Sequence, residues 1–586
     1  MRFFGWQRIP EVLVLIAILA AGLTREWNSP WDRTIRSDGK GYYAYLPALL
    51  LHQDPTYSFE YAYEHTYYHH EGEAPNYYRQ EVNGRTVNKY YPGLAILLLP
   101  FFLLSHIITL VMGAPPDGYG PIYQAGVAFA AMVYLWLGLR CCWALLRQLE
   151  FSKARSAAVL GSVFLGTNLF FYSLYGASFT HVYSFFLIGW LLWSVARFPE
   201  GKSWWSAAVA LGLLVLVRPV NALILLFLPV IWGNWKTMGK ALARPFKNWA
   251  MGLLLLAGLM TLLPLLWYWQ SGQWIVDSYA GEGFDFQHPH WWEFLASFRK
   301  GWLLYTPLAI FALGGCGYLL IKSPFRWTFT MLFLIAVVWV FSSWSSWWYG
   351  GSFGQRPMVD FSAVWMLLLA WSFTGLSRVS QVKKRAFAGT VLLLVLLNQF
   401  QTWQYRNYIL PNDNITPVIY AERFASFLRK TNVELPSNSQ KIRQTHHLVW
   451  SQTNAQKNIR PAEGTATGFA AYVGEGTAYS PGIEVALKEA VQRGANHALV
   501  AVELKAYDFL SPIALVIEVK AEGGETLHYA AKELGPYLPW RRWQEVQFLE
   551  ELPAEAHLLK AYLWDAKGEG KTAIGAYRVD LWSVPQ

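Results

Sequence analysis

Long apolar runs recur along this chain and decide what it can fold into. A bilayer-spanning helix needs about 20 predominantly apolar residues. Only 15% of the 586 residues are charged, whereas soluble proteins carry about a quarter. The sequence therefore predicts a polytopic α-helical membrane protein, with 31 Trp, 33 Tyr and 35 Phe supplying aromatic belts at the membrane interfaces. The first run covers 10–24, and the others lie at 123–146, 156–175, 180–197, 249–270, 301–321, 327–343, 357–376 and 386–402.

Three apolar stretches need separate interpretation. The stretch 204–234 is interrupted by Arg218-Pro219, and we expect two short spans with this pair at the tip, because proline ends one helix and can open the next. The segment 92–113 is apolar enough to cross, but a crossing there would invert every later loop, so we expect it to be re-entrant or to lie obliquely at the interface. The first run is expected to stay as an uncleaved helix and not to act as a signal peptide, since more spans follow. These assignments give eleven or twelve membrane segments.

Basic residues are concentrated in every second short loop, and this alternation predicts how the chain is oriented in the membrane. Loops rich in Lys and Arg face the cytoplasm, so the net charge of +10 does not point to nucleic acid. Asp38, Arg218, the loops 271–300 and 342–356 and everything after 403 then lie on the outer face, which predicts a multi-pass protein of a bacterial inner (cytoplasmic) membrane with a periplasmic site. The basic residues of the cytoplasmic set are Arg147, Lys153, Arg155, Arg197, Lys202, Lys236, Lys240, Arg244, Lys247, Lys322, Arg326, Arg378, Lys383, Lys384 and Arg385.

The composition turns polar after the last apolar run and predicts a second domain. Residues 415–430 suggest a helix near the membrane, and from about 440 the apolar residues alternate with period two, as at 499–504 and 514–519. The second of these strands runs into Gly523-Gly524, which is a hairpin signal. Short strands at this spacing are typical of an antiparallel β-sandwich of the jelly-roll type. The predicted domains are 1–410 (transmembrane, with 25–91 as the first outer loop), 411–439 (membrane-proximal helical linker) and 440–586 (extracytoplasmic β-sandwich).

Polar clusters on the predicted outer face are the candidates for chemistry. Asp38 follows the first span in a Gly-rich turn, and an ionisable residue at a membrane boundary is a functional hypothesis, although a solvated Asp in a turn is the alternative. Lys89 precedes an apolar segment and either meets an anion or extends to the headgroups. Arg218 either belongs to a functional site on the outer face or caps a helical hairpin. The backbone N–H groups of the Gly-rich segment 350–356, with Arg356, would make an anion nest, unless this segment is an ordinary turn.

The sequence does not decide whether the protein binds a metal. The segment 61–71 contains His65, His69 and Glu71, but their spacing matches no familiar set of ligands and a solvated loop is the simpler interpretation. The three cysteines all lie in apolar stretches, so we expect neither a disulfide framework nor a Cys-based metal site.

These motifs resemble the GT-C superfamily of polyprenyl-phosphate-sugar glycosyltransferases, and most closely its bacterial members similar to protein O-mannosyltransferases and aminoarabinose transferases. The resemblance covers 1–410. It rests on Asp38 in the first outer loop, Lys89 before Tyr-Tyr-Pro-Gly, the Arg218-Pro219 pair and Gly-Ser-Phe-Gly-Gln-Arg at 351–356.

The resemblance implies inverting transfer of a sugar from a polyprenyl-phosphate-linked donor, with Asp38 as general base. A GT-C-like catalytic domain in the membrane would use Lys89, Arg218, Arg356, Tyr91 and Gly351 to bind the lipid phosphate and donor. The implied partners are the donor, membrane lipid and a glycan, lipid or protein acceptor.

One departure from the family bears on metal use. Many relatives carry two adjacent acids in the first loop, whereas Gly39 follows Asp38 here. Asp54 is a candidate second carboxylate, so a divalent metal remains possible, and Asp54, His65, His69 and Glu71 form a possible acceptor or metal loop. The alternative function is a transporter or flippase of lipid-linked glycans, for which the chain shows neither an internal repeat nor charges within the spans.

Overall fold

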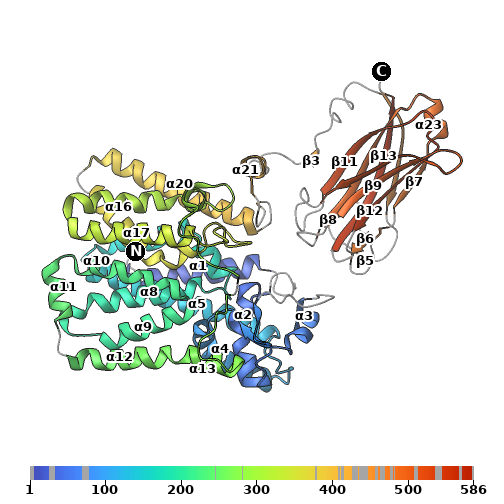
Figure 1. The fold of residues 1–586 in the computed structure, drawn as a ribbon. Coiled ribbons are helices and arrows are strands. Elements are labelled where there is room, and N and C mark those ends of the chain that lie inside the picture. The colour runs from blue at the N-terminus through green and yellow to red at the C-terminus, as the bar shows by residue number, and fades with distance from the viewer. Residues whose placement is uncertain are drawn as a thin grey trace. The chain divides into compact units, whose positions relative to one another are not determined.

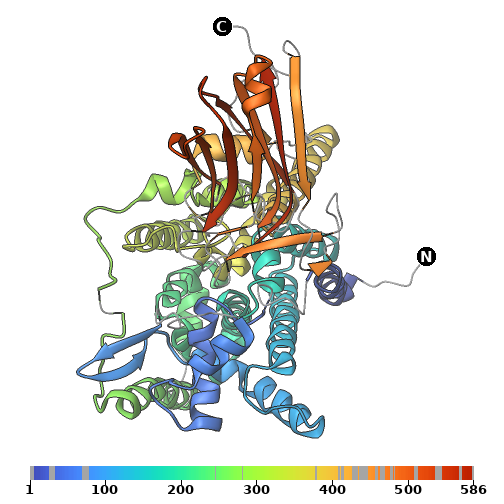
Figure 2. The same cartoon turned by 90° about the vertical axis from the view of Figure 1, so that its right-hand side faces the viewer.

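The chain forms two compact units in a computed structural model (Figures 1 and 2). The first unit comprises Met1–Thr402 with Asp413–Ile415, and the second Trp403–Asn412 with Thr416–Gln586. The structure describes residues 6–25, 33–68, 78–243, 246–279, 281–376, 379–406, 410, 413, 415–424, 433–434, 447–455, 460–461, 469–474, 479–480, 482–506, 513–534, 544–565 and 571–583.

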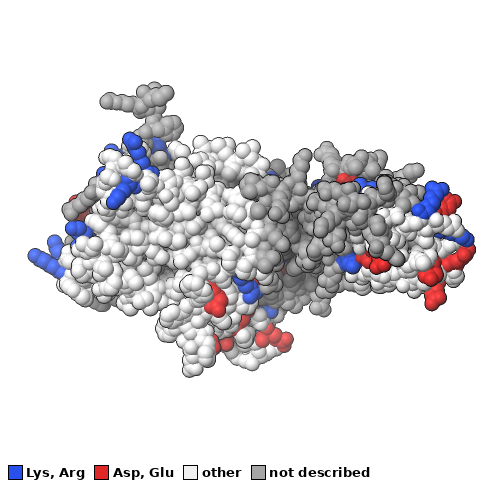
Figure 3. Space-filling view, turned by 90° about the horizontal axis from the view of Figure 1, so that it is seen from above, with Lys and Arg blue, Asp and Glu red and all other residues white. Residues whose placement is uncertain are grey.

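The first unit is helical, as predicted for a polytopic membrane protein. Within the described residues, seven helices are long and apolar enough to cross a membrane, and a bent pair with an angle of 116° would make an eighth. Three shorter apolar helices bring the apolar segments of the described residues to eleven. This set includes the segment 92–113, which was not expected to cross, and lacks the predicted run 156–175, which is divided between two short helices. On the face in Figure 3, the helical unit carries few charged side chains, and several Lys and Arg gather at one end.

The seven long candidates are η1 with α1 (Trp6–Arg8, Ile9–Thr24), α4 (Gly93–Val111), α5 (Pro121–Gln148), α8 with η4 (His181–Ala196, Phe198–Glu200), α12 with α13 (Phe246–Met260, Leu262–Ser271), α17 (Pro324–Ser342) and α20 (Gln381–Arg406). The bent pair is η5 with α10 (Pro219–Phe227, Leu228–Trp232) and α11 (Trp235–Leu242), and the shorter helices are α9 (Trp204–Val217), α16 (Leu308–Lys322) and α19 (Ser362–Gly375). The remaining helices after the first loop are α6 (Lys153–Gly166), α7 (Leu169–Leu174), α14 (Trp291–Ala296), α15 (Trp302–Tyr305) and α18 (Pro357–Asp360).

The predicted break at Arg218-Pro219 is confirmed. Helix α9 ends at Val217, Arg218 is extended with φ −156° and ψ 107°, and Pro219 opens η5. Proline suits this place because the first turn of a helix does not need its missing N–H. The break turns the Arg218 side chain away from the helical ladder and toward the site described below.

Helix α4 was expected to be re-entrant or oblique, and it is one continuous helix. A Cβ on Gly93 at its start would lie 2.3 Å from the backbone nitrogen of Val217, so this end packs against the end of α9. Further along, His106 Nδ1 lies 2.6 Å from the hydroxyl of Tyr123 near the start of α5, and the Phe102 ring packs on Tyr43. Both halves of α4 thus contact residues of the predicted outer side. A re-entrant segment would need a break, which this continuous helix lacks, so only the oblique arrangement stays a prediction.

The first outer loop folds against the helices and carries α2 (Asp38–Pro47). Two glycines allow the close approach, because a Cβ on Gly39 would lie 2.0 Å from Ser178 Oγ and one on Gly41 would lie 2.4 Å from the ring of Tyr90. The Tyr45 hydroxyl donates to the carbonyl of Tyr90 at 2.6 Å, one turn of α2 beyond Gly41. The other elements of the loop are η3 (Ala48–His52), α3 (Glu60–Tyr68), β1 (Arg79–Val82) and β2 (Arg85–Asn88).

The second unit contains two sheets, as expected for a β-sandwich. One has the strand order β10-β9-β12-β7, and the other has β3-β11-β8-β13-β6-β5 with β4 pairing β13. All pairings are antiparallel except β3 with β11. The hairpin predicted at Gly523-Gly524 is confirmed between β9 and β10, and Gly524 has a φ of +85°. The last two strands, β12 and β13, lie in different sheets.

Apolar side chains of both sheets form one buried core, among them Val500, Ile517, Leu559 and Leu581. The helix expected at 415–430 is present as α21 (Pro417–Phe424), and 425–430 lie outside the described residues. The jelly-roll connectivity stays a prediction. The elements of this unit are β3 (Val433–Glu434), β4 (His447–Ala455), β5 (Arg460–Pro461), β6 (Phe469–Gly474), β7 (Ile483–Ala486), α23 (Lys488–Gln492), β8 (His497–Ala506), β9 (Ile513–Lys520), β10 (Thr526–Glu533), β11 (Gln544–Glu551), β12 (Leu558–Asp565) and β13 (Lys571–Ser583).

Candidate active site

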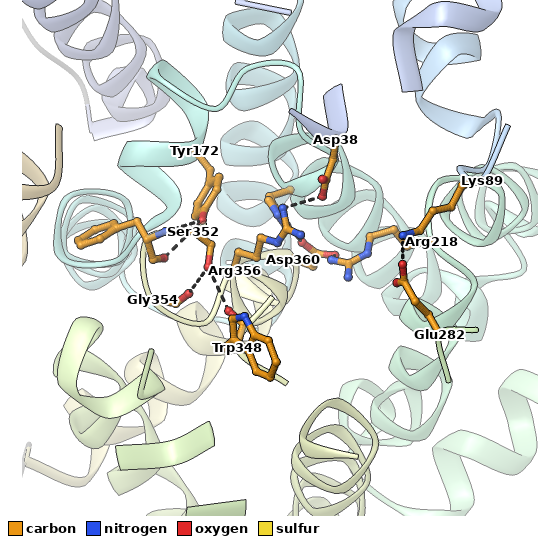
Figure 4. A network of polar contacts seen from close by, with 12 residues as sticks. Asp38, Lys89, Tyr172, Arg218, Glu282, Trp348, Ser352, Gly354, Arg356 and Asp360 are labelled. Atoms are coloured by element: carbon orange, nitrogen blue, oxygen red, sulfur yellow. Dashed lines mark hydrogen bonds and ion pairs between the residues drawn. The ribbon is translucent and has the colours of Figure 1, made fainter. Parts of the chain in front are cut away.

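One cavity of about 420 Å³ in the helical unit gathers side chains that are far apart in the sequence. Asp38, Lys89, Arg218 and Arg356 all line it, and Figure 4 shows the side chains of Asp38, Arg218 and Arg356 close together. Aromatic rings complete much of its wall, so the cavity combines charged groups with flat apolar surfaces. The aromatic residues of the wall are Tyr42, Tyr90, Tyr91, Tyr279, Phe284, Phe341, Trp344 and Tyr349.

Asp38 forms an ion pair with Arg356 at the first residue of α2. The distance from Arg356 Nη1 to Asp38 Oδ2 is 2.7 Å, and the two side chains are 15% and 22% exposed. Burial alone would raise the pKa of the Asp38 carboxyl, but the Arg356 guanidinium and a hydrogen bond from Tyr90 outweigh burial and lower this pKa below its ordinary value. Asp38 is therefore ionised at neutral pH and able to accept a proton.

The Gly-rich turn before α18 places Arg356, and buried contacts fix its path. Gly354 has a φ of +57°, and a Cβ there would lie 2.6 Å from the amide nitrogen of Asn168, so only glycine fits. The Ser352 hydroxyl donates to the carbonyl of Gly354 at 3.1 Å, and the buried ammonium of Lys300 donates to the carbonyl of Ser352. Burial lowers the pKa of Lys300 to about 7. The turn is thus held by hydrogen bonds to two of its backbone carbonyls, just before the residue it presents.

The structure changes one detail of the predicted anion nest. Gly350 lines the cavity with a φ of +63°, whereas its neighbour Gly351 is exposed and does not line it. Lys300 was not anticipated from the sequence, because its role depends on a segment about 50 residues further along the chain, at Ser352.

Arg218 reaches the cavity from a buried network of polar groups. Its Nη1 lies 3.1 Å from Asp360 Oδ2, which also accepts a hydrogen bond of 2.8 Å from the Asn221 amide. The other oxygen of Asp360 lies 2.6 Å from His181 Nδ1, and Asp360 is fully buried. Sequence reasoning did not find Asp360 or His181. The expectation that the spans carry no charges is wrong at this point, because Asp360 lies inside the predicted span 357–376.

Lys89 enters the cavity beside an acidic residue of the 271–300 loop. Its ammonium pairs with the carboxylate of Glu282 and lies 5.1 Å from the ring centroid of Tyr279. The Ser278 hydroxyl donates to the backbone carbonyl of Lys89 at 3.0 Å, and Tyr91 stacks on Tyr279 at 6.0 Å. Glu282 was not anticipated from the sequence, since nothing local ties it to a lysine 193 residues away.

The possible acceptor or metal loop lies apart from these residues as far as it is described. The Asp54 carboxylate is not part of the cavity wall and accepts four hydrogen bonds, two each from Thr56 and Ser58. Its partial burial would raise its pKa, but these hydrogen bonds outweigh burial and lower the pKa to about 2. The side chain of His65 and the whole of His69 and Glu71 lie outside the described residues.

The described residues around Asp38 do not fit a divalent cation. Metal sites need several oxygen or nitrogen ligands, whereas the carboxylate of Asp38 is paired with a guanidinium and Gly39 occupies the next position. Among the residues that the structure describes, no group of three His, Cys, Asp or Glu side chains is arranged to hold a metal ion.

Comparison with known proteins gives remote likenesses. No family model and no curated protein matches the sequence. Among solved structures, ArnT from Cupriavidus metallidurans is 15% identical, with 72% of each chain covered and a TM-score of 0.38. The archaeal oligosaccharyltransferase AglB from Archaeoglobus fulgidus is 12% identical, with 68% of this chain and 55% of AglB covered and a TM-score of 0.35.

The arabinosyltransferase EmbB from Mycobacterium smegmatis is also 12% identical, with 100% of this chain and 65% of EmbB covered and a TM-score of 0.36. Two of the three names are thus those of glycosyltransferases, the class that the sequence motifs resemble. TM-scores below 0.5 do not establish a common fold, so the proposal below rests on the residues of the cavity.

Proposed function

We propose that this protein is a membrane glycosyltransferase that moves a sugar from a polyprenyl-phosphate-linked donor to an acceptor, with inversion at the anomeric carbon. The observation that supports this proposal most is the cavity that holds the carboxylate of Asp38 together with the cations of Lys89, Arg218 and Arg356. The other carboxylate of its wall, Glu282, is paired with Lys89. Such a set suits a reaction in which a hydroxyl loses a proton while a phosphate leaves.

The proposed step forms one bond and breaks one bond. The acceptor oxygen forms a bond to the anomeric carbon, its proton moves to the carboxylate of Asp38, and the bond from the anomeric carbon to the phosphate oxygen breaks. Polyprenyl phosphate leaves with the electron pair, and its charge is met by Arg356, Lys89 and Arg218. A lipid-bound phosphate is already a fair leaving group, so this step does not depend on a metal.

The cavity wall suits the sugar as well as the phosphate. The tyrosine and tryptophan rings that line the cavity offer apolar faces for the C–H face of a sugar ring, and the tyrosines also offer hydroxyl groups for its oxygens. We place the reaction on the extracytoplasmic face of a bacterial inner membrane. Asp38 and Arg218 each follow an apolar run whose other end carries basic residues, and these basic ends face the cytoplasm. The acceptor is a glycan, a lipid or a protein.

The test uses the purified full-length protein with a polyprenyl-phosphate-sugar donor in detergent or nanodiscs. Release of free polyprenyl phosphate together with a glycosylated acceptor is the expected result, and Asp38→Asn should lower the rate by roughly 10²- to 10⁴-fold, the usual contribution of a general base. Asp117→Asn is the control, because Asp117 accepts two backbone hydrogen bonds of 2.8 and 2.9 Å just before α5 and lies outside the cavity wall. Near-normal transfer by Asp38→Asn would refute the assignment of the base, and movement of the sugar lipid without bond cleavage would indicate the alternative, a transporter.

A further inference from the structure

The smaller sheet of the second unit has one face that is not used by the core. Opposite residues of antiparallel strands lie on the same face of a sheet. The strand register therefore places Tyr529, Glu518, Lys560 and Glu484 in one row across β10, β9, β12 and β7. The alternate residues of β9 and β12, including Ile517 and Leu559, point the other way into the buried core.

Aromatic side chains continue along this face. Two positions after Lys560 on β12 comes Tyr562, and two further comes Trp564, which is bridged to Tyr479. Tyr479 is 62% exposed and Tyr529 is 57% exposed, and the ring centroids of Tyr479 and Tyr562 lie 6.0 Å apart. Large aromatic rings at these places bury little surface on folding, so the stability of the sandwich does not explain them.

The charges on this face are balanced in pairs. Lys560 Nζ lies 2.5 Å from Glu484 Oε1, and Lys520 Nζ lies 3.2 Å from Glu518 Oε1. The Thr526 hydroxyl also donates to Glu518 at 2.9 Å. Among the side chains described on this face, two carboxylates are matched by two ammonium groups. The described part of the face therefore carries no net charge and complements an electrically neutral ligand.

From these observations we propose that this face, defined by Tyr479, Glu484, Glu518, Tyr529, Lys560 and Tyr562, binds a neutral glycan chain. A pyranose ring presents apolar C–H groups on its flat side, which pack on an exposed aromatic ring, and hydroxyl groups at its edge, which donate to carboxylates and accept from ammonium groups. The alternation of rings and paired charges matches both sides of such a ligand.

Other classes of ligand fit this face less well. A membrane surface rich in anionic lipid would need an excess of Lys and Arg, and the four charged residues of the paired groups balance. A stable protein interface typically has an apolar core depleted in charge, whereas here the charged pairs Lys560–Glu484 and Lys520–Glu518 lie next to the rings. The site does not depend on the proposed transfer reaction, because every residue that forms it lies in the second unit.

The test is isothermal titration calorimetry of the full-length protein with neutral hexasaccharides, namely xylohexaose, cellohexaose and mannohexaose, and with hexagalacturonate as the charged comparison. We expect at least one neutral hexasaccharide to bind, and the charged chain to bind at least tenfold more weakly. The double variant Tyr529→Ala/Tyr562→Ala should weaken binding at least tenfold, whereas Tyr529→Phe/Tyr562→Phe should retain it, since the rings remain.

Two controls separate this face from the rest of the molecule. Lys505→Ala alters the other sheet, on β8, and should bind the glycan as the wild type does. Asp38→Asn should also bind unchanged, which distinguishes this face from the cavity and from any failure of the proposed transfer reaction. Absence of binding to all three neutral chains would overturn the proposal, and so would unchanged binding by a folded Tyr529→Ala/Tyr562→Ala protein.

Discussion

Replacement of Arg356 by lysine keeps the positive charge in the cavity and removes the planar fork of donors. Arg356 uses Nη1 for Asp38 at 2.7 Å, and its guanidinium lies 5.6 Å from the ring centroid of Phe179. A guanidinium carries five N–H donors in fixed directions, so once a donor substrate is bound, two of them can hold two oxygens of its phosphate. A lysine ammonium is a single point of charge and cannot hold two phosphate oxygens through such a fork.

The size of the effect follows from what is lost at this position. The Arg356 side chain is only 15% exposed, so water replaces a lost donor poorly. Donors that stabilise developing negative charge in a transition state are worth about 2–4 kcal/mol each, which corresponds to roughly 30- to 1,000-fold in rate. We expect Arg356→Lys to fall in this range despite its retained charge, and Lys89→Ala to fall in the same range.

The assay is single-turnover release of polyprenyl phosphate from a polyprenyl-phosphate-sugar donor. Arg299→Lys is the matched control, because Arg299 holds Asp413 through two nitrogens at 2.8 and 3.0 Å and lies outside the cavity wall. This variant loses a comparable fork and should keep the wild-type rate. If folded Lys89→Ala and Arg356→Lys proteins both transfer sugar at wild-type rates, the phosphate site proposed here is wrong.

Three further outcomes follow from the same contacts. Gly39→Ala would place a Cβ 2.0 Å from Ser178 Oγ and 2.9 Å from its carbonyl oxygen, so overpacking should destabilise the protein by about 1–3 kcal/mol; an unchanged thermal midpoint would contradict this packing. Glu282→Gln removes the carboxylate that pairs with Lys89, and because Glu282 is 37% exposed the KM for the donor should fall only modestly, roughly two- to fivefold; a higher KM would mean that Glu282 itself binds the donor. The pKa of Asp38 is lowered below its ordinary value in the free protein, whereas in the donor complex the Arg356 guanidinium has turned to the phosphate. Since kcat/KM reports the free protein and kcat the complex, the acid limb of kcat/KM should lie at a lower pH than the acid limb of kcat. Acid limbs at the same pH would show that the carboxylate keeps its partner throughout.

The general fold could be predicted because the decisive signals are local. Apolar run length, loop charge and the proline of Arg218-Pro219 act within a few residues, and they identify the helical segments and one break between them. The break between α6 and α7 carries no such signal. It allows the Asn168 amide to donate to the carbonyl of Phe353 at 2.9 Å, and a contact across 185 residues is invisible to a pattern that is read along the chain.

The candidate site shows the same division. Asp38, Lys89, Arg218 and Arg356 could be singled out because each is a charged residue at the edge of an apolar run, where its cost demands a reason. Their carboxylate partners depend on the fold. Glu282 meets Lys89 only because its loop lies over the cavity, and the acidic residue of the predicted span 357–376 becomes meaningful once it is seen beside Arg218.

The carboxylate partners of the three cavity cations differ in burial, and this difference bears on how the site works. Asp360 is fully buried and holds Arg218 with further help from His181, and separating such a pair would leave an uncompensated buried charge. Arg218 is therefore a fixed element. The partners of Arg356 and Lys89 are 22% and 37% exposed, so a phosphate can replace them at low cost. When the guanidinium leaves Asp38, its lowering effect on the pKa is withdrawn while burial remains, so the carboxylate becomes a stronger base only when a donor is present.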